Sequence, residues 1–76
     1  MKIGNLEIGS EAVLTGYEQG SKVYRQKLLR MGLVRGCRLK LLRKAPMGDP
    51  VEIELNGHKL TLRKSEADVL IIDAVK

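Results

Sequence analysis

The chain has 76 residues, enough for one small domain but not for two, and its hydrophobic content of 43% is that of a folded protein rather than a disordered one. Its single cysteine, Cys37, excludes an internal disulfide framework and favours a reducing, cytoplasmic setting. No apolar run approaches the roughly 20 residues of a membrane span. Residues 1–11 lack the apolar core of a secretion signal, so we expect a soluble protein without direct membrane insertion.

The net charge of +5 is concentrated in one segment. Residues 22–44 contain nine of the fourteen Lys and Arg residues and none of the nine Asp and Glu residues. The nine are Lys22, Arg25, Lys27, Arg30, Arg35, Arg38, Lys40, Arg43 and Lys44. Such a segment indicates either an anionic partner (nucleic acid, an acidic protein face or a membrane surface) or a solvated surface, and composition alone favours neither.

The first part of the chain predicts a lead-in, a strand and a helix. Residues 1–9 form the lead-in, and residues 11–17 alternate weakly, as a strand does, with Gly16 marking a bulge or bend. Ser21 has the residue type of an N-cap for a helix over residues 22–31. One core-facing stripe is predicted on this helix, formed by Tyr24, Leu28 and Met31 and widened by Val23 and Leu29.

The helix should end at Gly32, which suits the left-handed position after a helix, with Leu33 packing back on the last turn. Residues 37–44 then alternate and predict a strand with Cys37, Leu39 and Leu41 on one face. Leu42 interrupts the polar face of this strand. It is therefore either covered by the helix or exposed for a partner.

The remainder predicts three more strands. Residues 45–50 are rich in Pro and Gly and predict a turn. Residues 51–55 and 59–63 alternate on either side of Asn56-Gly57, the pattern of a hairpin with a two-residue type I′ turn. Ser65 as cap and Asp68 at the third helical position predict a short helical turn.

Residues 69–75 close the chain as an apolar strand. The order of elements predicts a mainly β fold, a small closed or partly closed barrel of about five strands with an inserted α-helix and a short C-terminal helical turn. Closure removes exposed strand edges, the usual hazard of a small sheet.

Residues able to carry chemistry are few. The only histidine, His58, follows the Asn-Gly turn, and Cys37 begins an alternating strand. We interpret them as a turn residue and a core residue, because a structural zinc site needs four ligands and a nucleophile pair needs an orienting third group. We therefore expect a non-enzyme with no catalytic residue, cofactor or metal site. Only Tyr17 and Tyr24 are aromatic, which argues against nucleic acid, because single-strand binders need stacking platforms.

Several short motifs in order resemble the FeoA family of ferrous-iron transport accessory proteins. They are Leu28-Leu29-Arg30-Met31-Gly32-Leu33, Gly36, Ala45-Pro46-Met47-Gly48-Asp49-Pro50-Val51, Asn56-Gly57, Leu60-Thr61-Leu62-Arg63 and Glu66-Ala67. The resemblance covers essentially the whole chain as one FeoA-like domain, residues 1–76. Arg35 departs from it, because the family usually places Pro before this Gly.

The resemblance implies an SH3-like β-barrel and a small cytoplasmic protein that does no chemistry. Such a protein would bind the cytoplasmic part of a membrane ferrous-iron transporter and support or regulate uptake. From the cationic segment and the apolar residues left over from the core, the candidate partner-binding residues are Arg30, Leu33, Val34, Arg35, Arg38, Leu42 and Met47. The alternatives are a small basic nucleic-acid-binding barrel, a direct metal binder, or a metal-responsive SH3-like module of a repressor type.

Overall fold

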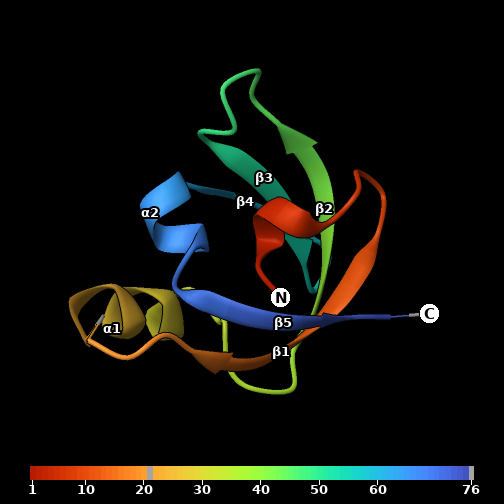
Figure 1. Cartoon of the computed structure of the whole chain (residues 1–76). Helices are drawn as coiled ribbons and strands as arrows, with labels where there is room; N and C mark the ends of the chain where they lie inside the picture. Colours follow the sequence, from red (N-terminus) through yellow and green to blue (C-terminus); the bar gives the residue numbers. More distant parts are fainter. Residues whose placement is uncertain (21, 76) are drawn as a thin grey trace.

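The computed structural model describes residues 1–20 and 22–75, which form a five-stranded antiparallel sheet with short helical segments (Figure 1). The elements are η1 (Ile3–Asn5), β1 (Glu11–Tyr17), α1 (Lys22–Arg30), β2 (Arg38–Lys44), β3 (Val51–Leu55), β4 (His58–Leu62), α2 (Lys64–Ala67) and β5 (Leu70–Ala74). This order of strands and helices confirms the prediction from the sequence. Ser21, the expected N-cap of α1, lies outside the described residues.

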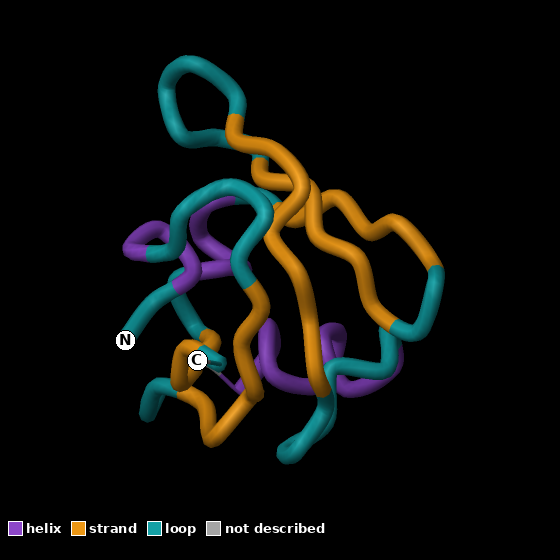
Figure 2. The backbone as a smooth tube through the Cα atoms, turned by 90° about the vertical axis from the view of Figure 1, so that its right-hand side faces the viewer, coloured by secondary structure: helices purple, strands orange, loops and turns teal. Residues whose placement is uncertain are grey.

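The strands lie in the order β4-β3-β2-β1-β5, and each neighbouring pair is antiparallel. The sheet curls into a partly closed barrel whose edges are β4 and β5 (Figures 1 and 2). The lead-in covers the outer edge of β5, where the Ile72 N–H donates to the Met1 carbonyl at 2.9 Å. Pairing this edge removes a site at which another chain could add a strand.

Two register shifts bend the sheet. One lies in β1 between Leu14 and Gly16, where the glycine predicted a bulge. The other lies in β2 between Leu41 and Arg43. An extra residue in one strand increases the local twist, which helps a sheet this small to close on itself. Leu42 is the extra residue of the second bulge, and this explains why it falls out of the strand's alternation.

The core is aliphatic and receives side chains from every strand. Its largest fully buried members are Ile3, Leu14, Leu28, Leu33, Leu39, Leu41, Ile53, Leu62, Leu70 and Ile72. Burying such a side chain contributes about 1.5–3 kcal/mol each, before the cost of ordering the chain is counted. The inward positions of β2 and β3 are the alternating residues predicted from the sequence.

The predicted core stripe of α1 is only partly correct. Leu28 is fully buried and Met31 packs partly on the core, but Tyr24 is 41% exposed and Val23 81% exposed. The helix ends at Arg30, one residue earlier than predicted. In Figure 1, α1 lies beside the end of β1 rather than across the middle of the sheet. It therefore buries one narrow ridge and leaves most of its circumference to solvent.

The cap of α2 differs from the prediction. The helix begins at Lys64, and Arg63, not Ser65, is its N-cap residue. Glu66, not Asp68, stands at the third helical position, where its Oε1 accepts the Arg63 N–H at 2.9 Å. This is the acidic half of a capping box. It carries Glu66 into the interior, where its side chain meets α1.

The hairpin between β3 and β4 confirms its prediction. Asn56 and Gly57 have φ values of 53° and 80°, so both central residues are left-handed, as a type I′ turn requires. The register then pairs Leu55 with His58 and Val51 with Leu62. The last strand, β5, is one residue shorter at each end than predicted.

Candidate docking surface

The cationic segment, residues 22–44, folds into α1, the loop that follows it and β2, and we call its first part, residues 22–38, the docking surface. Gly32 ends the helix with φ +94°, a conformation that L side chains rarely adopt. The Leu33 N–H then donates back to the Leu28 carbonyl at 3.0 Å, and its side chain is fully buried. The Tyr17 hydroxyl donates to the Leu33 carbonyl, so β1 also holds the start of the loop.

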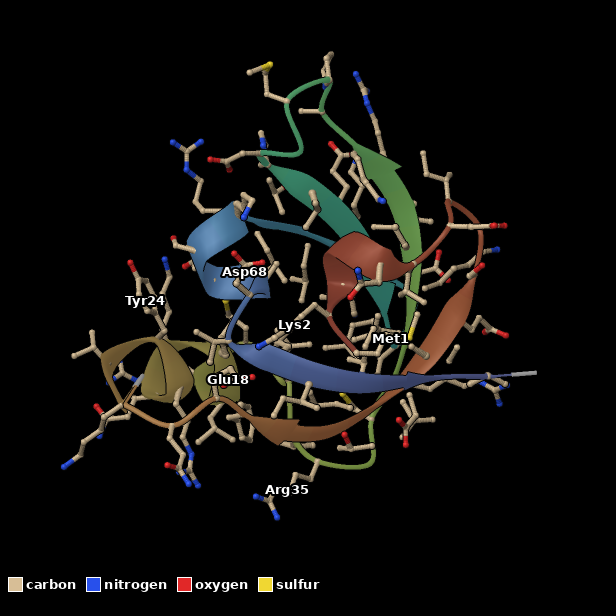
Figure 3. All side chains as sticks on the ribbon, viewed as in Figure 1. Met1, Lys2, Glu18, Tyr24, Arg35 and Asp68 are labelled. Carbon is tan, nitrogen blue, oxygen red and sulfur yellow. The ribbon has the colours of Figure 1, made fainter. Side chains whose placement is uncertain are left out.

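The outer part of this loop presents Val34 and Arg35 to solvent. Val34 is 47% exposed, and Arg35 extends away from the body of the molecule (Figure 3). Behind them the Gly36 N–H donates to the Leu14 carbonyl at 2.8 Å, and the Leu14 N–H donates to the Cys37 carbonyl at 2.9 Å. These bonds fasten the loop to β1, so the two exposed side chains stand on a fixed tip.

Some cations of the docking surface have partners. Lys27 Nζ lies 2.5 Å from Glu66 Oε2, and Arg38 lies 3.6 Å from the carboxylate of Glu11. The guanidinium carbon of Arg25 lies 5.3 Å from the centre of the Tyr17 ring, a cation–π geometry. These contacts join the docking surface to β1 and α2.

Other cations are left to solvent. Lys22, Arg30 and Arg35 are exposed, and none of them forms an ion pair within residues 1–20 and 22–75. Acidic side chains are absent from residues 22–38. The docking surface therefore carries cationic charge that the described part of the fold does not neutralise.

Apolar side chains are exposed among these cations. Of the large hydrophobic residues that are exposed in the described chain, Val23, Tyr24, Leu29 and Val34 belong to the docking surface. The sequence interpretation missed the first three because it assigned them to the core stripe. The sequence does indicate the exposure of Val23, because around the helix it lies between Arg30 and Lys27.

The predicted partner-binding residues do not form one surface. Arg30, Val34, Arg35 and Arg38 are exposed on the docking surface, whereas Leu33 is fully buried and must be removed from the set. Leu42 is partly buried at the β2 bulge. Met47 is 89% exposed, but it belongs to the turn between β2 and β3, at the opposite end of the molecule from the α1–β2 loop (Figure 1).

Glu66 of α2 connects the docking surface to the barrel through its ion pair with Lys27. Its side chain is buried, while that of Lys27 is mostly exposed. The Lys27 ammonium, followed by the Arg63 N–H, lowers the pKa of Glu66 below its usual value and outweighs burial, which acts in the opposite direction. Glu66 is therefore ionised at neutral pH and paired with a cation whose charge still reaches solvent.

Cys37 and Tyr17 lie behind the loop and keep their protons. Burial raises the pKa of the Cys37 thiol above its ordinary value. Burial, followed by the neighbouring Cys37, also raises the pKa of Tyr17, although Arg25 and Arg35 act against this change. A protonated thiol is a poor nucleophile, which agrees with the interpretation of Cys37 as a small core residue.

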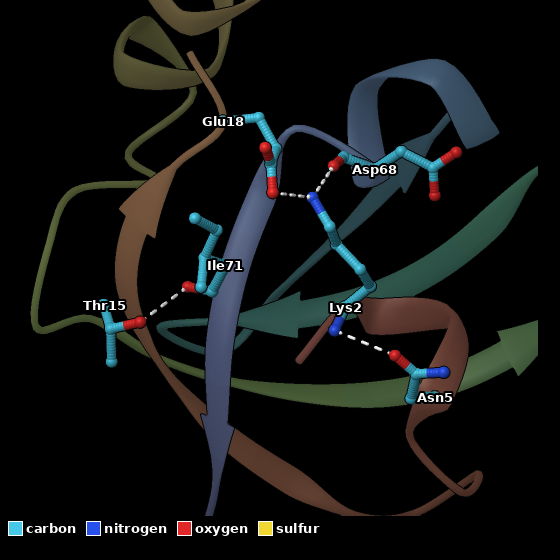
Figure 4. A network of polar contacts seen from close by, with 6 residues as sticks. All are labelled: Lys2, Asn5, Thr15, Glu18, Asp68 and Ile71. Carbon is cyan, nitrogen blue, oxygen red and sulfur yellow. Dashed lines mark hydrogen bonds and ion pairs between the residues drawn. The ribbon is translucent and has the colours of Figure 1, made fainter.

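A cavity of about 410 Å³ lies elsewhere, between η1, the end of β2 and α2. Lys2, Lys44 and Lys64 line it, and all three ammonium groups are engaged. Lys2 Nζ binds Glu18 Oε1 and the Asp68 carbonyl at 2.5 Å each (Figure 4). Lys44 donates to the Gly4 carbonyl at 3.0 Å, and Lys64 to Asp68 Oδ2 at 2.9 Å. The Lys2 and Lys44 contacts tie the lead-in to the barrel, whereas the Lys64 contact is local to α2 and its C-cap residue.

Within residues 1–20 and 22–75, no group of three or more His, Cys, Asp and Glu side chains is arranged to hold a metal ion. Over the same residues, none of the helices combines the length and the apolar character needed to cross a membrane. The docking surface itself offers exposed cations and exposed apolar side chains.

The architecture is that of a small SH3-like barrel. FeoA from Stenotrophomonas maltophilia, solved in complex with zinc and described as a prokaryotic SH3 domain protein, matches with a TM-score of 0.81, 24% identity, and coverage of 96% of this chain and 89% of that one. A manganese-dependent transcriptional repressor in complex with manganese matches with a TM-score of 0.90 and 10% identity, over 99% of this chain and 36% of that one. At these identities the two matches show the fold alone.

The chain belongs to the FeoA family, because the family model described as the FeoA domain matches residues 1–74. An FeoA-like protein from Clostridium acetobutylicum is 39% identical, with a TM-score of 0.88 and coverage of 100% of this chain and 87% of that one. A Porphyromonas gingivalis protein, the Fe(2+) transport protein A/Fe(2+) transporter FeoB fusion protein, is 29% identical over 75 residues. The match covers 99% of this chain but only 9% of the length of that relative. The resemblance read from the motifs is thereby confirmed.

Proposed function

We propose that this chain is a non-enzymatic accessory protein that binds the cytoplasmic part of a membrane ferrous-iron transporter and supports or regulates iron uptake. The observation that carries the proposal is the relative in which Fe(2+) transport protein A and the FeoB transporter are one polypeptide. Fusion keeps two modules at a high effective concentration, which is useful when they work in contact.

The geometry supplies a surface suited to such contact. Val34 offers apolar area that a partner can cover, and Arg35 beside it offers a charge that orients an acidic partner. Buried apolar area contributes most of the affinity at such contacts, and the surrounding charges mainly set the association rate and the orientation. Because backbone bonds to β1 hold the tip, binding orders little additional chain.

The test is binding to the separated cytoplasmic domain of the transporter, measured in a pull-down and by biolayer interferometry at low salt. Arg35→Glu should weaken binding by roughly tenfold, chiefly through slower association. Arg43→Glu is the matched control, because it makes the same charge change on the exposed end of β2 outside the docking surface. Equal binding by the wild type and Arg35→Glu at low salt would exclude the docking surface as the contact.

A further inference from the structure

The solvent side of α1 combines charge and exposed apolar groups in an unusual way. At about 100° per residue, Gln26 and Arg30 lie opposite the buried Leu28, with Lys22 and Val23 on either side of them. Val23 is 81% exposed, and Leu29 at the margin of this side is 40% exposed. We call this the outer side of α1, namely Lys22, Val23, Gln26, Leu29 and Arg30.

We propose that the outer side of α1 binds the surface of an anionic lipid bilayer, lying at the level of the headgroups without crossing the membrane. Lys22 and Arg30 would contact lipid phosphates, and Val23 and Leu29 would enter the boundary between headgroups and acyl chains. Exposed cations beside exposed aliphatic side chains are the groups by which peripheral proteins bind anionic lipid. The proposal is independent of any transporter contact.

Charge complementarity supports the bilayer as the occupant. Four cations and no acidic residue lie within Lys22–Arg30, and the buried partner Glu66 offsets only Lys27. An anionic leaflet attracts such a cluster without any requirement for matched shape. Arg35, on the loop that follows α1, is a further exposed cation.

The arrangement of the exposed side chains favours lipid over a partner's helical groove or nucleic acid. Val23 and Leu29 flank the cations of α1 instead of forming the continuous apolar stripe that docking into a helical groove would require. A fluid headgroup layer adapts to such a surface. Only one tyrosine, Tyr24, is available on α1 to stack on a base.

Tryptophan fluorescence provides a direct test, because the chain contains no tryptophan. Val23→Trp in the 76-residue chain should shift its emission to shorter wavelength when vesicles of phosphatidylglycerol and phosphatidylcholine are added at low salt. Pure phosphatidylcholine vesicles should cause no shift. Met47→Trp is the matched control, because Met47 is 89% exposed in the β2–β3 turn at the other end of the molecule, and its emission should stay unchanged.

Co-sedimentation with the same anionic vesicles measures the contribution of charge. Neutralising one cation should weaken binding about fivefold, so Lys22→Gln/Arg30→Gln should weaken it roughly 25-fold. Arg43→Gln/Lys59→Gln makes the same charge change away from α1 and should bind as the wild type does. Raising the salt concentration to 0.5 M should release the protein, because exposed charges are then screened within a few ångströms.

Three results would overturn the proposal. They are the absence of co-sedimentation with phosphatidylglycerol vesicles at low salt, equal blue shifts at positions 23 and 47, and unchanged binding by Lys22→Gln/Arg30→Gln. Binding of the transporter domain through the same residues, without any binding to vesicles, would assign the outer side to protein contact instead. Vesicles without a transporter keep this outcome separate from the fate of the proposed function.

Discussion

Lys27 of α1 and Glu66 of α2 form an ion pair with an Nζ–Oε2 distance of 2.5 Å, although the Glu66 side chain is only 5% exposed. The same carboxylate accepts the Arg63 N–H at 2.9 Å through its other oxygen. One buried group thus caps α2 and holds α1 against the barrel. Leu28 is the only α1 residue that is buried, so this pair is a principal tether of α1.

Lys27→Gln should therefore destabilise the fold by roughly 1–2 kcal/mol, because it leaves a buried carboxylate without its cation. Glu66→Gln should cost less, about 1 kcal/mol, since the neutral amide can still accept the Arg63 N–H and Lys27 remains solvated. Urea unfolding of the two single variants and the double variant gives the coupling energy, which should be close to 1 kcal/mol.

The control for this cycle is Lys64→Gln, which breaks an ion pair of 2.9 Å between two largely exposed side chains, Lys64 and Asp68. Such pairs on helices contribute about 0.3–0.5 kcal/mol. A loss in Lys64→Gln as large as that in Lys27→Gln would show that burial of Glu66 does not strengthen its pair.

Glu66 also predicts the response of the fold to acid. Its pKa is lower in the folded protein than in the unfolded chain, because the Lys27 ammonium and the Arg63 N–H favour the carboxylate. Its contribution is therefore complete above the unfolded pKa of about 4.5 and is lost as the pH falls through the lower folded value. Thermal unfolding between pH 7 and 3 should show a stability loss below about pH 4.5 that is smaller in Glu66→Gln. Parallel pH profiles for the two proteins would contradict this assignment.

The strands could be predicted because a residue's place in a small barrel follows from alternation along the chain. The faces of β2 and β3 and the Asn56-Gly57 turn are local patterns, and the structure confirms them. The prediction that Tyr24 is buried was wrong, because helical periodicity identifies an apolar stripe but not how much of that stripe the rest of the fold covers. Only the position of α1 beside the end of β1 shows that one ridge is buried.

The sequence predicted the positive charge of the candidate site but not which of its apolar residues are exposed. The exposure of Arg30 and Arg35 followed from the cationic segment. Leu33 and its neighbour Val34 are both apolar in sequence, yet Leu33 is fully buried and Val34 is exposed. Glu66 was assigned no role, because its partner Lys27 comes from a distant element and no local pattern links the two. Tertiary contacts of this kind decide which cations remain free.

The helix stop at Gly32 predicts a specific cost. Its φ of +94° strains any L residue, and a Cβ there would stand 3.5 Å from Leu55 Cδ2, an ordinary contact distance. Gly32→Ala should therefore destabilise by about 1–2 kcal/mol through backbone strain alone. Gly36→Ala, with φ +87° and open space around its Cβ, should cost a similar amount.

Gly4→Ala separates strain from the loss of a glycine as such, because Gly4 has an ordinary φ and nothing within 4 Å of an added Cβ. It should be neutral or stabilising by up to about 1 kcal/mol, since alanine restricts the unfolded chain. Chemical denaturation of the three variants tests the comparison. A Gly32→Ala protein as stable as the wild type would mean that the loop relaxes to another path.

Tyr17 should limit the local opening of the loop between α1 and β2. Its hydroxyl donates to the Leu33 carbonyl, and its ring stacks against Arg25, so Tyr17→Phe removes the first contact and keeps the second. The loss should be about 0.5–1.5 kcal/mol, with faster hydrogen exchange at the amides of residues 33–37 measured by NMR. Tyr24→Phe is the control, because Tyr24 is 41% exposed at the edge of the molecule (Figure 3), and its stability should stay within about 0.5 kcal/mol of the wild type. Equal exchange in Tyr17→Phe and the wild type would show that the Gly36–Leu14 and Leu14–Cys37 backbone bonds suffice to hold the loop.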